Sequence, residues 1–244
     1  FTFKIQFLQM KIFKNKHKLI KEISKKKDIA FIPTMGSIHD GHLSLINKAK
    51  RKSNNILVSI YVNPKQFGSH LDFKKYPRSL SKDIRLLQKK KVKYLYIPNR
   101  KDIYSFRTKS NIFLDKFSQK LCGKFRPNHF KGVIDVVNRF LEIIRPKFMY
   151  LGMKDYQQIT LIKSHIKKNN INTKIKICST IREKNGVALS SRNIKLNGNQ
   201  MKIAAKICKY LKINKKKILL KILNQKKKEI LSAIKKFGIK KIDY

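Results

Sequence analysis

The feature that most constrains how this chain folds is residues 31–45, which have the pattern of a strand, a tight turn and a helix. A short apolar run, Ile29 to Ile32, is typical of a buried strand, and apolar residues recur at helical spacing from Gly41 onward. Gly36 and Gly41 allow the backbone between the two elements to approach a ligand closely. The pattern therefore predicts a strand–turn–helix unit with a binding loop at the turn.

Two histidines, His39 and His42, lie on that loop and on the first turn of the expected helix. The free N–H groups and the dipole at a helix N-terminus favour an anion, typically phosphate. Imidazoles add donors that can become cationic as charge builds on a phosphate in transfer. The residues alone leave two other interpretations open, namely a helix-capping loop or half of a metal site.

Further strands and helices alternate along the chain, which predicts a parallel α/β sheet with its ligand loops at one edge. Residues 101–120 show no clear period, so we expect a loop there with at most one short strand. The expected strands are residues 29–33, 56–62, 94–97, 148–151 and 174–179, and the expected helices are 17–27, 79–91 and 131–145.

The helix predicted at residues 131–145 has the clearest 3.6-residue period in the chain. Its apolar positions are interpreted as packing positions and not as chemistry. They are Val133, Val136, Val137, Phe140, Leu141 and Ile144.

Beyond Lys195 the pattern is helical and rich in lysine. We expect amphipathic helices around 203–211 and 230–234, with Gly238 ending the second. Residues 239–244 have the pattern of a strand with nothing of its own to pair with, so we expect a truncated C-terminal domain.

The net charge of +47 arises from 60 Lys and Arg against 13 Asp and Glu. Such a charge is compatible with nucleic-acid binding. The lysines, however, are spread over the whole chain and accompany heavy use of Ile and Asn, which share A/T-rich codons with Lys. Composition bias therefore explains the charge better, and we expect only non-specific, salt-sensitive binding of polyanions.

Other properties of the composition indicate a cytoplasmic globular protein. The 244 residues suffice for one to two domains, and a hydrophobic content of 41% argues against global disorder. No apolar run is long enough to span a membrane, and residues 1–9 lack a signal-peptide cleavage site. Met10 is a candidate start, which would make residues 1–9 an upstream extension. The odd number of cysteines, without metal spacing, fits a reducing compartment.

The stretch from Pro33 to His42 contains the H-x-G-H signature of nucleotidyltransferases, and with its flanks it resembles the pantothenate synthetase (pantoate–β-alanine ligase) family. Three positions depart from the family pattern: Cys122 stands for a carboxylate, Asn128 for a glycine and Met153 for a glutamate. Asn is the least costly substitute for Gly where the backbone φ is positive. The other similar segments, in the family order, are residues 63–68, 121–130, 152–158 and 182–193.

This resemblance implies an α/β fold, in which a Rossmann-like parallel sheet of the nucleotidyltransferase type (residues 10–182) is followed by a small, truncated α+β lid domain (residues 183–244). It also implies a cytoplasmic homodimer that condenses pantoate with β-alanine through a pantoyl-adenylate. ATP would be a substrate that carries Mg²⁺, and no resident metal is expected.

The resemblance also implies site residues. His42, His39, Lys154 and Arg192 are the expected catalytic residues, with His42 as proton donor, and Gln66 and Gln158 are expected to bind pantoate. The expected ATP-binding residues are Met35, Gly36, Ser37, Ile38, His39, Asp40, Gly41, His42, Gly152, Met153, Lys154, Asp155, Ile181, Leu189, Ser190, Ser191 and Arg192.

Two alternatives remain at this point. One is an H-x-G-H nucleotidyltransferase that acts on a different acceptor, against which the segments at 63–68 and 121–130 argue. The other is a degenerate, non-catalytic basic protein that binds nucleic acid. This alternative of a degenerate enzyme is favoured by Met153, Cys122 and the short C-terminus. Retention of both histidines argues against loss of catalysis.

Overall fold

The computed structural model of the chain describes residues 9–215, 223–239 and 241–243. Its contacts divide the chain into two compact units, residues 1–180 and 181–244, and each is described by itself. Residues 1–8 of the expected upstream extension lie outside the described residues. No helix of the described part is long and apolar enough to cross a membrane.

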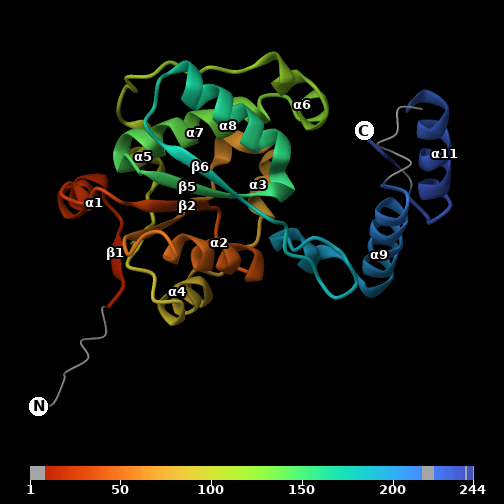
Figure 1. The fold of residues 1–244 in the computed structure, drawn as a ribbon, viewed down its shortest axis with the longest axis horizontal. Coiled ribbons are helices and arrows are strands. Elements are labelled where there is room, and N and C mark those ends of the chain that lie inside the picture. The colour runs from red at the N-terminus through yellow and green to blue at the C-terminus, as the bar shows by residue number, and fades with distance from the viewer. Residues whose placement is uncertain (1–8, 216–222, 240, 244) are drawn as a thin grey trace, which may run out of the picture. The chain divides into compact units, whose positions relative to one another are not determined.

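The first unit is built on a parallel sheet, as the alternation of strands and helices predicts (Figure 1). Among the described residues six strands form it, in the order β1-β4-β3-β2-β5-β6, and every neighbouring pair is parallel. The strands are β1 (Lys11–Phe13), β2 (Ala30–Thr34), β3 (Ile56–Ile60), β4 (Tyr94–Tyr96), β5 (Phe148–Gly152) and β6 (Lys174–Cys178).

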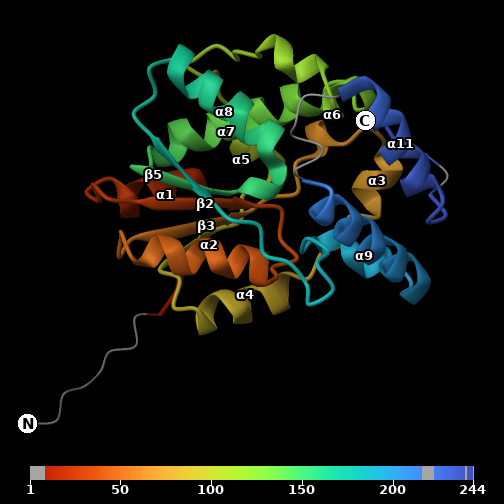
Figure 2. The same ribbon diagram turned by 45° about the vertical axis from the view of Figure 1, so that its right-hand side comes forward.

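Helices cover both faces of this sheet (Figure 1 and Figure 2). Successive strand residues point to opposite faces, so Phe31 of β2 packs with α7 and α8 while Ile32 packs with α2 and α4. The helices of the unit are α1 (Lys16–Ile23), α2 (Asp40–Lys50), α3 (His70–Lys74), α4 (Leu80–Lys89), α5 (Arg100–Tyr104), α6 (Cys122–Phe125), α7 (His129–Ile144) and α8 (Tyr156–Lys168), with short 3-10 helices η1 (Pro64–Gln66), η2 (Lys116–Gln119) and η3 (Met153–Asp155).

Helix α7 is the central helix of its face, and the predicted packing positions are confirmed. All six are buried: Val133, Val136, Val137, Phe140, Leu141 and Ile144. The side chain of Phe140 contacts Phe31 of the sheet, with 5.4 Å between ring centroids. The helix ends at Ile144, and its C-cap residue Arg145, which has a left-handed φ of +47°, is followed by Pro146.

The structure corrects three sequence predictions. Residues 101–120 contain most of helix α5 and all of η2, but no strand. Strand β1, a three-residue edge strand at Lys11–Phe13, was not predicted. The described residues of 239–244 form no strand, while residues 240 and 244 of that prediction lie outside the described residues.

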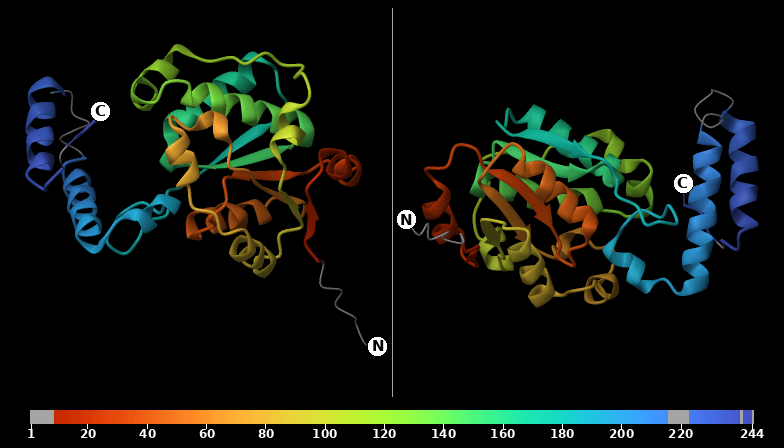
Figure 3. Two further views of the ribbon diagram at one scale, coloured as in Figure 1. Left: turned by 180° about the vertical axis from the view of Figure 1, so that it is seen from behind. Right: turned by 60° about the horizontal axis from the view of Figure 1, so that its bottom comes forward.

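The second unit is mainly helical in its described residues. Helices α9 (Gly198–Ile213) and α11 (Leu223–Lys235) lie side by side (Figure 3). Tyr210 on α9 contacts Phe237, just beyond α11, with 5.9 Å between ring centroids. The only β-type pairing described in this unit is an isolated antiparallel bridge between Arg182 and Ala188.

Candidate active site

The first unit brings two functional loops together at the point where the strand order reverses. From β2 the chain proceeds outward through β3 and β4, and then returns to place β5 on the other side of β2. Ligands of open α/β sheets bind in the crevice at the carboxyl ends of such strands. Here the segment containing both histidines follows β2, and the segment Met153–Asp155 follows β5.

The loop after β2 is held in an unusual conformation by a carboxylate on α4. Gly36 and Ser37 both have positive φ angles, +79° and +51°. The side chain of Asp83, 1% exposed, accepts the N–H groups of Ser37 and Ile38, each at 2.8 Å. A Cβ at Gly36 would lie 3.1 Å from Asp83 Oδ2 and 3.1 Å from Ile60 Cγ2. Glycine is therefore favoured at position 36, because any other residue would be strained at this φ angle and its Cβ would crowd Asp83 and Ile60.

The two histidines contact each other at the start of α2. Their ring centroids are 4.1 Å apart. His39 Nδ1 accepts the backbone N–H of Gly41 at 3.1 Å, and His42 Nδ1 accepts that of His39 at 3.4 Å. Because each Nδ1 acts as an acceptor, the proton of each neutral ring is assigned to Nε2. Each ring thus has an Nε2–H group to offer a ligand.

Both imidazoles are neutral near pH 7. Burial lowers the pKa of His39, and the positive charge of Lys154 lowers it further. Burial, with the charges of His39 and Lys154, lowers the pKa of His42 to about 3. This electrostatic coupling also shows that Lys154, from the segment after β5, lies near the histidines. The expected role of His42 as proton donor is therefore less favoured in the free site than that of a neutral hydrogen-bond donor.

Gln66 lies in the adjacent loop after β3, beside the histidine loop. Its Nε2 donates to Met35 Sδ at 2.9 Å, and its Oε1 accepts from Asn63 Nδ2 at 3.3 Å. Its backbone carbonyl is 2.7 Å from Nδ1 of His129, at the start of α7. The structure thus brings together Met35 and Gln66, which are predicted from the sequence for the ATP and pantoate sites respectively.

The two adjacent glutamines at the start of α8 have different environments. Gln157 is buried and structural, because its Nε2 donates to the carbonyl groups of Phe117 (2.9 Å) and Lys120 (2.7 Å). Gln158, the expected pantoate ligand, is only half-buried. Gln158 is therefore more accessible to a ligand than Gln157, whose amide already binds two backbone carbonyl groups.

The remaining expected ATP-binding residues belong to the second unit. Leu189 donates its N–H to the carbonyl of Ile181 at 3.0 Å, which closes a turn containing Gly186 at φ +88°. Ser190 then caps the short 3-10 helix η4 (Ser191–Lys195), its Oγ accepting the N–H of Arg192 at 3.2 Å. Residues 190–192 therefore form one compact segment directly after the turn.

No group of three or more His, Cys, Asp or Glu side chains within the described ranges could hold a metal ion. The polar groups gathered at the carboxyl edge of the sheet are instead neutral donors, a lysine and amides. Such groups suit a ligand that carries phosphate and carboxylate oxygens.

The sequence of the chain matches that of a known family over nearly its whole length. The sequence profile described as pantoate–β-alanine ligase matches residues 9–244. The chain belongs to the pantoate–β-alanine ligase family. It is accordingly a ligase that joins pantoate to β-alanine.

Individual members of the pantoate–β-alanine ligase family agree with this assignment. The chain is 38% identical to the pantothenate synthetase of Pseudothermotoga lettingae over 229 residues, which are 93% of this chain and 82% of that protein. It is 42% identical to that of Francisella tularensis subsp. novicida over 203 residues, 82% of this chain and 77% of that protein.

Solved structures of the family share the fold. A crystal structure of pantoate-beta-alanine ligase from Francisella tularensis, complexed with Beta-gamma ATP and Beta-alanine, has a TM-score of 0.81 and 39% identity, covering 94% of this chain and 86% of that chain. A structure of the Thermus thermophilus enzyme has a TM-score of 0.82 and 31% identity, covering 93% of this chain and 82% of that chain.

The three departures from the family pattern have different surroundings. Asn128 has a φ of +61°, so the expectation that Asn replaces Gly at a left-handed position is confirmed. Cys122 begins α6 and donates its backbone N–H to Gln157 Oε1 at 3.2 Å. Met153 is 48% exposed at the carboxyl end of β5. The Asn128 and Cys122 segments thus keep ordered local structure.

Asp83 is the main site-forming residue that the sequence pattern does not reveal. It contacts the histidine loop across 45 and 46 positions of sequence. The only available signal was an acidic residue near the start of an amphipathic helix, and that signal is ordinarily explained by the helix dipole.

Proposed function

We propose that the chain condenses pantoate with β-alanine in two ATP-dependent steps. First, a carboxylate oxygen of pantoate attacks the α-phosphate of ATP, the bond to the β-phosphate breaks, and pyrophosphate leaves. Second, the amine of β-alanine attacks the acyl carbon of pantoyl-adenylate, AMP leaves, and the nitrogen loses a proton as the amide forms. The first step is needed because a carboxylate is a poor electrophile. Mg²⁺ enters with ATP as part of the substrate.

One observation carries this proposal. At the strand-order reversal, two neutral imidazoles and Lys154 lie at the carboxyl ends of β2 and β5, beside the loop of Gln66. Preorganised N–H donors and a cation stabilise the charge that develops on a phosphate in transfer. Neighbouring amides suit the hydroxyl and carboxylate groups of pantoate. The Francisella tularensis ligase, which was crystallised in complex with Beta-gamma ATP and Beta-alanine, supports the same substrates.

For the first unit the proposed roles rest on this arrangement, and for residues 181–192 of the second unit they rest on the resemblance to the family segment. His39 and His42 donate Nε2–H groups to phosphate oxygens, and Lys154 neutralises phosphate charge. Gln66 and Gln158 bind pantoate. The backbone from Met35 to His42, the segment Gly152–Asp155, and Ile181 and Leu189 contact ATP, and Ser190, Ser191 and Arg192 hold the triphosphate.

Pantoate-dependent ATP–pyrophosphate exchange tests the first step, and AMP release on addition of β-alanine tests the second. We expect exchange only when pantoate is present, and AMP release only when both pantoate and β-alanine are present. Exchange without AMP release would place a defect in the second step. A folded chain that shows no exchange, or that exchanges equally well with an unrelated hydroxy acid, would refute the proposal.

We also propose that the enzyme works as a cytoplasmic homodimer. Its cysteines, Cys122, Cys178 and Cys208, are free thiols, which suits a reducing compartment. Ile112 and Leu114 are 38% and 37% exposed, and a second copy could cover this apolar surface. Sedimentation equilibrium should give a mass near twice 28.8 kDa. A monomer at all micromolar concentrations would contradict the homodimer.

A further inference from the structure

The loop that carries Gln66 rests directly on the backbone of α7. A Cβ built at Gly132 would lie 2.2 Å from the carbonyl oxygen of Lys65 and 2.9 Å from the backbone nitrogen of Gln66. The carbonyl of Gly132 accepts from Asn63 Nδ2 at 3.0 Å. The first turns of α7 therefore form the support for residues 63–66, and small displacements of either element would move Gln66.

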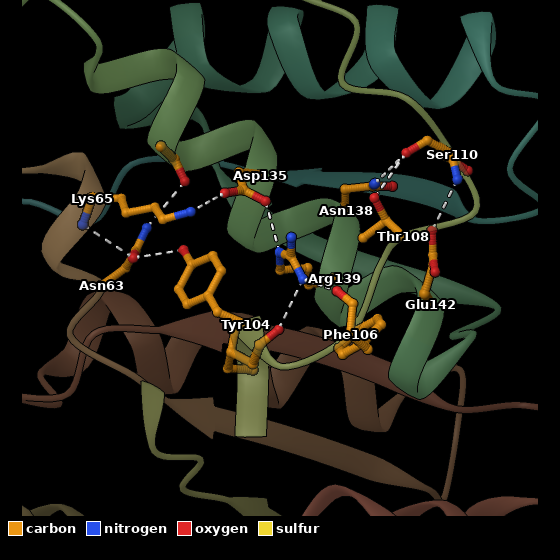
Figure 4. Close-up of polar contacts among 12 residues, drawn as sticks. Asn63, Lys65, Tyr104, Phe106, Thr108, Ser110, Asp135, Asn138, Arg139 and Glu142 are labelled. Atoms are coloured by element: carbon orange, nitrogen blue, oxygen red, sulfur yellow. Dashed lines mark hydrogen bonds and ion pairs between the residues drawn. The ribbon is translucent and has the colours of Figure 1, made fainter. Parts of the chain in front are cut away.

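One turn further along α7, a buried carboxylate joins this loop to the helix. Asp135 Oδ2 is 2.9 Å from Lys65 Nζ, and its Oδ1 is 2.7 Å from Arg139 Nε (Figure 4). The side chain of Asp135 is 9% exposed and that of Lys65 is 44% exposed. Arg139 keeps Asp135 paired from within the helix, whereas Lys65 is the cation that reaches it from the loop.

Tyr104 contacts both the loop and the two cations that pair with Asp135. Lys65 Nζ lies 4.0 Å above its ring centroid, and the Arg139 guanidinium carbon lies 4.8 Å from it. Its hydroxyl donates to Asn63 Oδ1 at 2.9 Å, as Figure 4 shows. Burial raises the pKa of Tyr104, so the hydroxyl keeps its proton as donor. Arg139 also donates to the carbonyls of Ile103 (3.1 Å) and Phe106 (2.7 Å), which fixes the segment containing Tyr104.

These contacts determine which way the amide of Asn63 points. Its Oδ1 accepts from Tyr104 and from the N–H of Lys65, the latter at 3.3 Å, so its Nδ2 faces Gly132 and Gln66 Oε1. With Oε1 engaged by Asn63, the Gln66 amide directs Nε2 toward Met35 Sδ. A continuous chain of contacts thus runs from Asp135 to the side chain of Gln66.

We propose that Lys65 and Asp135 are positioning residues for pantoate, which orient Gln66 through this ion pair without touching the substrate. The inference rests on the proposed role of Gln66 as a pantoate ligand. Its basis is the geometry. The Lys65–Asp135 ion pair ties this loop to α7. Lys65 also contacts Tyr104, Tyr104 donates to Asn63, and Asn63 donates to Gln66, so the position of Lys65 affects the orientation of Gln66. A partly exposed pair of this kind contributes little to global stability, so its effect should be seen in substrate binding.

The test is Lys65→Met, which keeps the length and apolar stem of the side chain but removes its charge. Because Arg139 still pairs with Asp135, we expect the fold to be retained, with a Tm near that of the unaltered chain. In pantoate-dependent ATP–pyrophosphate exchange, we expect KM for pantoate to rise about tenfold, with KM for ATP unchanged. Lys65→Arg should restore most of the pantoate affinity, since a guanidinium can also pair with Asp135 and stack on Tyr104.

Lys16→Met is the matched control, because Lys16 Nζ also lies over an aromatic ring, 4.2 Å from the centroid of Phe106, but belongs to α1. It should leave both KM values unchanged. Three results would overturn this inference while leaving the proposed function intact. They are an unchanged KM for pantoate in Lys65→Met, an equal rise in its KM for ATP, and a failure of Lys65→Arg to restore the affinity for pantoate. Absence of exchange in the unaltered chain would overturn the proposed function, and the inference with it.

Discussion

At the scale of single residues, the contact between His39 and His42 governs their chemistry. Two imidazoles with ring centroids 4.1 Å apart, beside Lys154, would repel each other if both were charged. The free site therefore holds them as neutral donors with their protons on Nε2. If ATP binds here as proposed, we expect its negative charge to raise the pKa of both rings and to strengthen their hydrogen bonds to phosphate.

His42→Ala should reduce the rate of pantoate-dependent pyrophosphate exchange by about 10²–10³-fold, as removal of one preorganised donor does in comparable sites. The fold should be retained, because the substitution removes only the long 3.4 Å contact between His42 Nδ1 and the backbone N–H of His39. The measurement is kcat for exchange, with circular dichroism to check folding. His17→Ala, on the exposed side of α1, is the control and should keep full activity. Normal turnover in His42→Ala would show that His42 has no role in the reaction.

The pKa of His42 also predicts how stability depends on pH. The native state takes up this proton only near pH 3, whereas the unfolded chain takes it up near 6.5. Between these values the unfolded state binds more protons, so stability falls as pH drops below 6.5, by up to about 1.4 kcal/mol per pH unit for one such group. Urea unfolding from pH 7 to pH 4 should show a shallower loss in His42→Ala than in the unaltered chain. Equal slopes would mean that His42 titrates normally in the native state.

At the scale of elements, α4 holds the histidine loop through Asp83. Ser79 Oγ, at the N-terminus of the same helix, donates to Asp83 Oδ1 at 3.1 Å and so orients the carboxylate. Asp83→Ala would leave the N–H groups of Ser37 and Ile38 without their acceptor, each at a cost of about 1–3 kcal/mol. We expect lower stability in urea and a raised KM for ATP.

Ser79→Ala provides the graded comparison for this prediction. It removes one hydrogen bond but leaves both loop N–H groups paired, so it should destabilise by only about 1 kcal/mol. A smaller effect from Asp83→Ala than from Ser79→Ala would show that α4 does not hold the loop.

The elements that the sequence predicts well are those with a clear period, whereas α8 was not predicted although it has thirteen residues. Helix α7 has sixteen residues and six apolar positions in register, and the buried strands have near-continuous apolar runs. Strand β1 and helix α5 have only three and five residues, too few for a pattern to be seen. Helix α5 depends instead on distant partners, since Asp102 accepts from the N–H of Lys16 and from the hydroxyl of Tyr96.

The same reasoning separates the predictable part of the site from the rest. His39, Lys154 and Gln66 lie in segments that directly follow strands, where the sequence pattern already indicates a ligand edge. Asp83 and Asp135 lie within helices, and their partners are 45 and 70 positions away. Only the folded chain shows which helical carboxylate faces which loop.

At the scale of the whole molecule, the charge of +47 is the dominant electrostatic feature. Several of the few carboxylates are already engaged by backbone N–H groups or side chains, so they cannot each neutralise a lysine at the surface. The engaged carboxylates include Asp28, Asp83, Asp102 and Glu142. Most of the cations in the described part of the chain face water, and their mutual repulsion opposes the compact state.

Salt should consequently stabilise this enzyme. Sodium chloride at about 0.5 M reduces the Debye length to roughly 4 Å, which screens repulsion between surface lysines. We expect Tm to rise between about 20 mM and about 0.5 M salt, by about 2–4 °C for each kcal/mol of repulsion relieved. Lys154→Met should show the same rise, because the effect comes from the whole surface and not from anion binding at the candidate active site. A Tm that stays constant or falls with salt in both proteins would show that the cations are already compensated within the fold.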